Sequence, residues 1–240
     1  MDQARSRGRR IAFFGGSFDP PHLGHLAVAR AAREALDLDA VLFAPVGAQP
    51  LKPLGSSAGF EDRVAMTRLA VAAEPALAVS LADAPKPDGA PNYTLETLMA
   101  LRQELPTGSL LFCLMGADSF VGLHGWHQAA EIPFAAPLIV ASRPGQQLDD
   151  LRAALPAGLW LEPASPDWIP PRSGVEVRTW ELRNPAGDGT PFFLLPGVNV
   201  EISASEIREQ VRAARSSLEQ GHELLPDPVS AYIRSHGLYQ

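Results

Sequence analysis

Two histidines near the N-terminus, His22 and His25, are the residues whose type and spacing most clearly predict chemistry. They lie in the sequence Gly-Gly-Ser-Phe-Asp-Pro-Pro-His-Leu-Gly-His, which spans residues 15–25. An imidazole can donate a hydrogen bond to a phosphate oxygen and can stabilise negative charge that grows during phosphoryl transfer. We therefore expect both side chains to contact a phosphate. A zinc site is the competing hypothesis, and the absence of Cys or Glu from the motif argues against it.

The residues around the two histidines are typical of a phosphate-binding turn. An apolar run over residues 11–14 precedes the glycines, and an Ala-rich helical pattern follows the motif. The turn therefore leads into a helix N-terminus, where free N–H groups and the helix dipole favour an anion. We expect Gly15 and Gly16 to permit a sharp turn, and Gly24 to allow a close approach of the backbone to the ligand. The candidate phosphate-binding residues here are Gly15, Gly16, Ser17, Phe18 and Gly24.

A second candidate phosphate site lies near the C-terminus, at Ser203, Ser205 and Arg208. Ser203 and Glu206 form a capping-box pattern, which predicts a helix over residues 204–215. Two hydroxyls at a helix N-terminus, with an arginine one turn further on, are a group of donors that fits an anion. A simple helix cap is the plainer alternative.

The elements that must position these residues alternate between short apolar runs and segments of helical periodicity. Apolar runs without alternation are typical of parallel strands covered on both faces, so we expect a Rossmann-like, doubly wound α/β sheet with flanking helices. Ligands bind at the carboxyl ends of such strands, where Asp118 and Ser119 also lie. The predicted strands are 11–14, 40–44, 77–81, 109–115 and 137–141, and the predicted helices are 25–36, 60–73, 94–104, 204–215 and one that begins at Asp227.

The chain is long enough for one large domain, and we expect a single domain over residues 1–240 with a small C-terminal helical region. Residues 1–10 are predicted to be a flexible tail. Residues from about 163 to 196 are rich in Pro and Gly and predict an irregular insertion or an edge hairpin, with possible strands at 175–182 and 192–195.

Composition and charge argue against several classes of protein. The net charge of −7 does not favour a nucleic-acid partner, and no apolar run approaches the length of a membrane span. The single cysteine, Cys113, excludes a disulfide framework and fits a reducing compartment, so we expect a cytoplasmic protein. The Walker phosphate loop and the Gly-x-Gly-x-x-Gly dinucleotide motif are both absent, which argues against P-loop enzymes and Rossmann dehydrogenases.

Residues 15–25 resemble the first signature of the HxGH nucleotidylyltransferase superfamily. Residues 202–208 look like its second signature, which usually reads Ile-Ser-Ser-Thr-x-x-Arg; Ala204 and Ser205 replace the commoner Ser and Thr. Class I aminoacyl-tRNA synthetases share the histidine motif, but this chain has no Lys-Met-Ser-Lys-Ser-like loop. Pantetheine-phosphate and glycerol-phosphate nucleotidylyltransferases resemble it less.

Further similarity points, within the superfamily, to the bacterial nicotinate-nucleotide adenylyltransferases; it lies at Trp126 and at residues 91–94, 116–119, 138–145 and 224–239. The resemblance implies that ATP and nicotinate mononucleotide are the substrates, that deamido-NAD and pyrophosphate are the products, and that Mg²⁺ arrives with ATP. Two alternatives stay open: a nucleotidylyltransferase that uses nicotinamide mononucleotide, and a non-catalytic nucleotide sensor on the same fold. The intact histidine pair argues against the sensor.

The resemblance also implies roles for single residues. His22, His25, Lys52 and Arg208 would be the catalytic donors to the reacting phosphates, although Leu51 departs from the family's usual pattern in the loop that holds Lys52. Asp118, Ser119 and Arg143 would contact the adenylate half of ATP, with an Asx turn at Asp118 and a surface arginine at Arg143 as the plainer alternatives.

The pyridine nucleotide would be held by Tyr93, Thr94 and Trp126. Backbone N–H groups at the start of a helix can bind the nicotinate carboxylate, and an indole can lie over the pyridinium ring. A helix cap at Thr94 and a packing role for Trp126 are the plainer alternatives. Arg63 is a weaker phosphate candidate, and a solvated helix face explains it equally well.

Overall fold

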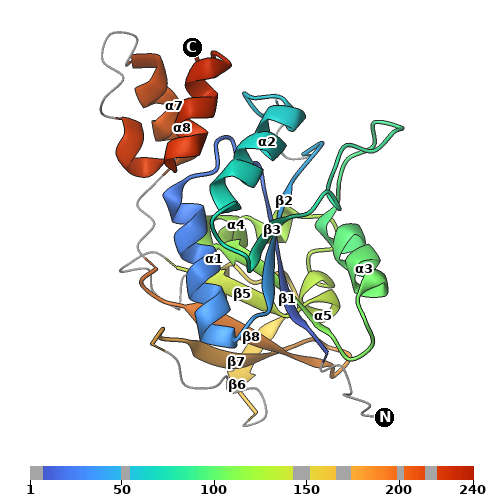
Figure 1. The fold of residues 1–240 in the computed structure, drawn as a ribbon. Coiled ribbons are helices and arrows are strands. Elements are labelled where there is room, and N and C mark those ends of the chain that lie inside the picture. Colours follow the sequence, from blue (N-terminus) through green and yellow to red (C-terminus); the bar gives the residue numbers. More distant parts are fainter. Residues whose placement is uncertain (1–7, 50–54, 143–151, 166–173, 199–202, 214–220) are drawn as a thin grey trace, which may run out of the picture.

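A computed structural model describes residues 8–49, 55–142, 152–165, 174–198, 203–213 and 221–240. Within these residues, eight strands form one sheet in the order β3-β2-β1-β4-β5-β8-β7-β6 (Figure 1). The strands are β1 (Arg10–Gly16), β2 (Ala40–Pro45), β3 (Leu77–Val79), β4 (Leu110–Gly116), β5 (Leu138–Ala141), β6 (Trp160–Pro163), β7 (Arg178–Arg183) and β8 (Gly189–Leu195). The helices are α1 (Leu23–Leu36), α2 (Phe60–Val71), α3 (Thr94–Glu104), α4 (Ala117–Val121), α5 (Ile132–Ala135), α7 (Ala204–Ala213) and α8 (Asp227–Ser235), with 3-10 turns η1 (Leu123–Gly125) and η3 (Gly221–Leu224).

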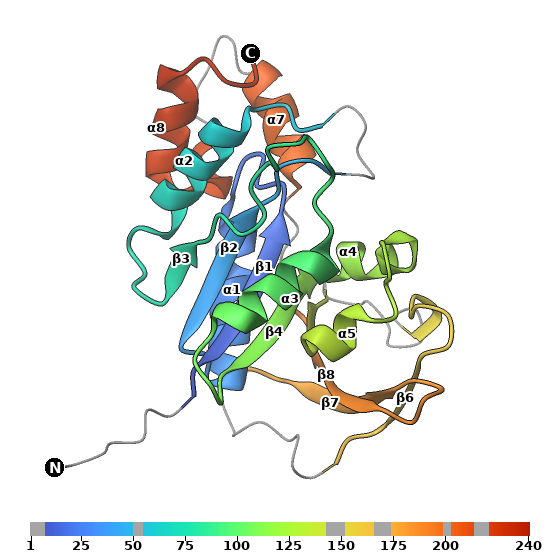
Figure 2. The same cartoon turned by 90° about the vertical axis from the view of Figure 1, so that its right-hand side faces the viewer.

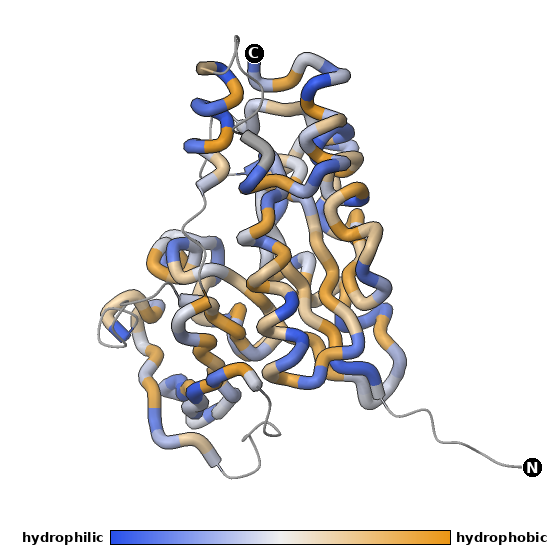
Figure 3. Tube along the Cα trace, turned by 60° about the vertical axis from the view of Figure 1, so that its left-hand side comes forward, coloured by the Kyte–Doolittle hydropathy of each residue, from blue (hydrophilic) through white to orange (hydrophobic). Residues whose placement is uncertain are grey.

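The sheet from β3 to β8 is parallel, and helices cover both of its faces (Figure 2). Side chains alternate along β1, so Phe13 packs with Leu98 of α3 on one face while Phe14 packs with Leu26 of α1 on the other. Both faces are therefore apolar, which accounts for the hydrophobic colour of the central strands in Figure 3. The predicted doubly wound α/β sheet is confirmed.

The two remaining strands add an antiparallel edge that the sequence only partly predicted. β7 pairs antiparallel with β8, and β6 pairs antiparallel with β7 at the edge of the sheet. β8 also pairs in parallel with β5, so it continues the main sheet. Strand β6 gave little signal in the sequence because it is not buried: Trp160 remains 40% exposed.

The C-terminal helices α7 and α8 pack with α2 beyond the carboxyl ends of the strands (Figures 1 and 2). Met66 of α2, Ile207 of α7, and Val229 and Ile233 of α8 form a separate apolar cluster there. The expected small C-terminal helical region is therefore present, and it is positioned to reach the ligand-binding end of the sheet. No helix in the described part of the chain is long and apolar enough to cross a membrane.

Candidate active site

A cavity of about 530 Å³ opens at the carboxyl ends of β1, β4 and β5. Its walls come from the turn after β1, from the start of α4 and from the N-terminus of α7. Most of the predicted phosphate-binding residues line it, although they come from three separate stretches of the chain. These residues are Gly15, Gly16, Ser17, Phe18, His22, Gly24, His25, Asp118, Ser119, Ser203, Ser205 and Arg208.

Helix α1 begins at Leu23, two residues earlier than predicted, with His22 at the N-cap. The His22 backbone N–H donates to His25 Nδ1 over 3.2 Å, so His25 carries its proton on Nε2 when the ring is neutral. The two rings stack with centroids 3.7 Å apart. His22 Nδ1 is buried and has no hydrogen-bond partner among the described residues. The backbone thus orients the His25 imidazole, whereas the buried Nδ1 of His22 is left without a partner in the described part of the chain.

Burial keeps both imidazoles neutral. It lowers the pKa of His22 from its ordinary value of 6.5 to about 4. It also lowers the pKa of His25 well below the ordinary value, and the neighbouring His22 lowers it further. Phe18 contributes to this apolar surrounding, because its ring lies edge-on to His25 with centroids 4.9 Å apart. Both histidines therefore act as neutral hydrogen-bonding groups at neutral pH in the free protein.

Gly15 and Gly16, the last two residues of β1, leave room for neighbouring aromatic rings and do not have an unusual backbone conformation. A Cβ atom at Gly15 would lie 2.8 Å from the Phe13 ring, and one at Gly16 would lie 3.2 Å from the Phe18 ring. The residue with positive φ in this turn is Phe18, at 48°. The expected turn is present, and neither Gly15 nor Gly16 has the positive φ that favours glycine in a turn.

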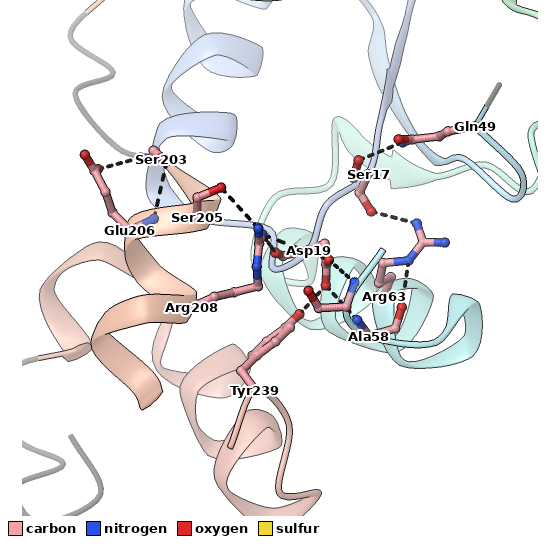
Figure 4. A network of polar contacts seen from close by, with 11 residues as sticks. Ser17, Asp19, Gln49, Ala58, Arg63, Ser203, Ser205, Glu206, Arg208 and Tyr239 are labelled. Atoms are coloured by element: carbon pink, nitrogen blue, oxygen red, sulfur yellow. Dashed lines mark hydrogen bonds and ion pairs between the residues drawn. The ribbon is translucent and has the colours of Figure 1, made fainter. Parts of the chain in front are cut away.

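The side chain of Asp19 connects the turn to two other parts of the chain, and sequence reasoning missed it (Figure 4). Its carboxylate accepts hydrogen bonds from the backbone N–H groups of Ser57 (2.6 Å) and Ala58 (3.0 Å) and from the hydroxyl of Tyr239 (2.7 Å). Asp19 is only 4% exposed. An aspartate inside the motif was visible in the sequence, but its partners were not, because they lie far away in the chain.

Arg208 extends from α7 to the same turn. Its Nη1 donates to the Asp19 carbonyl oxygen over 2.7 Å, and its Nη2 donates to Ser205 Oγ over 3.1 Å. Ser203 and Glu206 form the predicted capping box, with distances of 3.3 and 3.4 Å between backbone nitrogens and side-chain oxygens. Ser205 thus orients the guanidinium, while Ser203 caps the helix.

Arg63 is neither a phosphate ligand in this cavity nor part of a solvated helix face. Its side chain is buried and donates to three backbone carbonyl oxygens, those of Ala58, Ser17 and Val46. Burial lowers its pKa, although Asp19 nearby opposes this effect. The guanidinium therefore holds the backbone of the phosphate turn at Ser17. This role is visible only in the folded chain.

The residues predicted to hold the pyridine nucleotide do not line this cavity. Tyr93, and not Thr94, is the N-cap of α3, so Thr94 is the first helical residue. The Tyr93 ring lies against His127, with centroids 4.4 Å apart, which places the start of α3 beside the residue that follows Trp126. Trp126 is partly buried against the core.

Hydrogen bonds of residues 48 and 49 connect the start of α3 to the phosphate turn. Gln49 Nε2 donates to Ser17 Oγ over 2.7 Å, and the backbone of Ala48 exchanges hydrogen bonds with Asn92, the residue before Tyr93. Of the predicted site residues, Lys52 and Arg143 lie outside the described part of the chain.

Comparison with known proteins identifies the family. The model of cytidylyltransferase-like proteins matches residues 13–210. The chain belongs to this family. A protein of Gloeobacter violaceus named probable nicotinate-nucleotide adenylyltransferase is 36% identical over 232 residues, which cover 97% of each chain. A protein of Trichlorobacter lovleyi with the same name is also 36% identical, over 96% of this chain and 99% of its own.

Solved structures agree with the family fold. Nicotinic acid mononucleotide adenylyltransferase of Plasmodium falciparum, complexed with NaAD, superposes with a TM-score of 0.68 at 14% identity and covers 96% of this chain and 97% of its own. The same enzyme complexed with APC gives a TM-score of 0.66. The family resemblance inferred from the two motifs is thus confirmed.

Proposed function

We propose that this protein transfers the adenylyl group of ATP to nicotinate mononucleotide, forming deamido-NAD and releasing pyrophosphate. The observation that carries the proposal is the cavity in which His22, His25 and Arg208 meet, although they come from opposite ends of the chain. Full-length relatives named as nicotinate-nucleotide adenylyltransferases support the choice of reaction. The reaction would serve NAD biosynthesis.

In the proposed reaction, a phosphate oxygen of nicotinate mononucleotide attacks the α-phosphorus of ATP in line. A new P–O bond forms there, and the bond between the α-phosphorus and the oxygen that bridges to the β-phosphorus breaks. A phosphate is already a nucleophile near neutral pH, so the protein needs only to position the groups and stabilise charge. His22, His25 and Arg208 all line the cavity, and we propose that the Nε2–H of His25 and the guanidinium of Arg208 donate to the phosphates.

Mg²⁺ enters this proposal as part of the substrate MgATP. The described residues contain no group of three or more His, Cys, Asp or Glu side chains that could hold a metal ion. Asp19, the carboxylate beside the histidines, already accepts hydrogen bonds from Ser57, Ala58 and Tyr239. We propose Lys52, Arg143, Asp118 and Ser119 as further contacts to ATP.

The acceptor would bind at the start of α3. The N–H groups of Tyr93 and Thr94 lie at that helix N-terminus, which favours a carboxylate, and nicotinate has one where nicotinamide has an amide. Trp126 would lie over the pyridinium ring. This chemistry supports nicotinate mononucleotide over nicotinamide mononucleotide. We also propose a cytoplasmic location, because Cys113 is a buried free thiol that fits a reducing compartment.

A direct assay tests the function. The protein is mixed with ATP, Mg²⁺ and nicotinate mononucleotide, pyrophosphate is measured, and the dinucleotide is identified by mass. We expect stoichiometric formation of both products, and at least tenfold lower kcat/KM with nicotinamide mononucleotide. Tight ATP binding without pyrophosphate would instead identify a nucleotide sensor, and equal use of both acceptors would overturn the assignment of the carboxylate site.

A further inference from the structure

We propose that Tyr239 is a positioning residue for adenylyl transfer, acting through Asp19 on Arg208; this inference rests on the proposed function. The Tyr239 hydroxyl donates to Asp19 Oδ1 over 2.7 Å, and the two residues are 8% and 4% exposed (Figure 4). This buried hydrogen bond joins the segment after α8 directly to the turn that holds the histidines.

Asp19 connects the Tyr239 hydroxyl to the residues that are proposed to bind the phosphates. Its backbone carbonyl oxygen accepts the 2.7 Å hydrogen bond from Arg208, and it lies three residues before His22. Its carboxylate also holds the backbone of Ser57 and Ala58, and Ser57 lines the cavity. A shift of the Asp19 side chain would therefore move groups on two walls of the cavity.

The Tyr239 hydroxyl also affects how strongly the Asp19 carboxylate attracts the Arg208 guanidinium. Arg208 Nη1 lies 4.0 Å from Asp19 Oδ2, at the limit of an ion pair, and it bonds to the Asp19 carbonyl oxygen instead. Removing the hydroxyl would leave Oδ1 with only the Ala58 amide as its hydrogen-bond donor among the contacts described. A buried carboxylate that loses a donor attracts the nearest cation more strongly. Arg208 would then be drawn towards Asp19 and away from the phosphates.

The backbone places Tyr239 independently of its hydroxyl. Gly237 and Tyr239 both have positive φ, at 61° and 65°, and the Leu238 N–H donates to the Ile233 carbonyl oxygen over 3.1 Å. The Tyr239 ring belongs to the apolar cluster that includes Ile207, the residue before Arg208. Burial is the main cause that raises the pKa of Tyr239 above its ordinary value. The phenol therefore stays protonated and donates its hydrogen bond to Asp19. Phenylalanine should therefore occupy the same place without the hydrogen bond.

The chain offers a matched control in Tyr232. Its hydroxyl also donates to a carboxylate, Asp62 Oδ1, over 3.0 Å, and this bond joins the C-terminal region to α2. Asp62 does not line the cavity. Each of the variants Tyr239→Phe and Tyr232→Phe thus removes a hydrogen bond from tyrosine to a carboxylate. The first bond is buried and connected to the phosphate turn, and the second is partly buried and is not connected to it.

The experiment measures kcat, both KM values and Tm for wild type and both variants. We expect Tyr239→Phe to lower kcat about tenfold, with both KM values changed less than twofold, and Tyr232→Phe to keep kcat within twofold. If Tyr239 acts through Arg208, adding Tyr239→Phe to Arg208→Lys should lower kcat less than twofold further, because effects on one network are not additive.

Any one of four results would contradict the inference. Wild-type kcat in Tyr239→Phe, an equal loss in Tyr232→Phe, or a full tenfold further loss in the Arg208→Lys background would each exclude a positioning role. A fall in kcat that is explained by a lower Tm, and that recovers when the assay is cooled, would likewise assign Tyr239 to stability alone. Failure of the proposed function is distinguishable, because the wild type itself would then release no pyrophosphate.

Discussion

The imidazole rings of His22 and His25 lie stacked, with centroids 3.7 Å apart and planes inclined by 28°. Two positive charges at this distance would repel each other, and the N-terminus of α1 would add to the cost. Burial lowers the pKa of both groups, and the neighbouring His22 lowers the pKa of His25 further. The pair therefore offers N–H donors to a phosphate without first having to lose a hydration shell around a charge.

We predict that His25→Ala lowers kcat by about 10²–10³, because one preorganised donor to the transition state is lost. Steady-state kinetics of pyrophosphate release would measure this. The variant His236→Ala removes an exposed imidazole at the end of α8 and serves as the control, for which we expect kcat within twofold of wild type. Near-normal turnover in a folded His25→Ala protein would remove His25 from the proposed mechanism.

We predict that stability falls as the pH is lowered from 7 to 5. The folded-state pKa of His22 is about 4, against an ordinary value of 6.5, so the unfolded chain binds the proton more readily in that range. The contribution of His22 is fully present above pH 6.5 and is lost as the pH falls towards 4. From this shift we estimate a loss of about 2 kcal/mol between pH 7 and pH 5.

Urea unfolding at several pH values, in wild type and in His22→Gln, isolates this effect. The free energy of unfolding of the variant should depend less on pH than that of the wild type. Histidine NMR titration provides an independent check, since the His22 signal should not titrate between pH 6 and 8. Titration of His22 near pH 6.5 would contradict the prediction.

We predict that Arg63→Met lowers the free energy of unfolding by about 3 kcal/mol or more, because three buried carbonyl oxygens lose a charged donor. Arg68→Met changes an exposed arginine on the same helix and should cost less than about 0.5 kcal/mol. Denaturant unfolding of both variants makes the comparison. Equal small losses would show that the Arg63 hydrogen bonds contribute little to stability.

We predict that Trp126→Ala raises KM for nicotinate mononucleotide about tenfold, the equivalent of about 1.4 kcal/mol of lost ring contact, and leaves KM for ATP unchanged. Trp160→Ala removes an exposed tryptophan on β6 and is the control. An unchanged KM for the mononucleotide, or an equal rise for ATP, would assign Trp126 to core packing alone.

Local patterns in the sequence were sufficient for the elements and for the family. The helix predicted over residues 94–104 coincides with α3, and the strands of the parallel sheet were found within a few residues, because periodicity and Pro or Gly stops are read from neighbouring residues. The histidine motif and the Ser203–Arg208 pattern similarly predict phosphate binding from residues that are close together in the sequence. Strand β6 was missed, since an exposed edge strand has no strong apolar pattern.

How these local segments act together depends on contacts between residues that are distant in the sequence. The burial of Arg63, the contact of Arg208 with Asp19, and the hydrogen bond from Tyr239 all join residues that are far apart in the chain. The neutral state of the histidines has the same origin, because the desolvation that lowers a pKa is set by what packs around the ring. The sequence by itself determined which groups could bind a phosphate, and the folded chain determined their charge, their orientation and the residues that hold them in place.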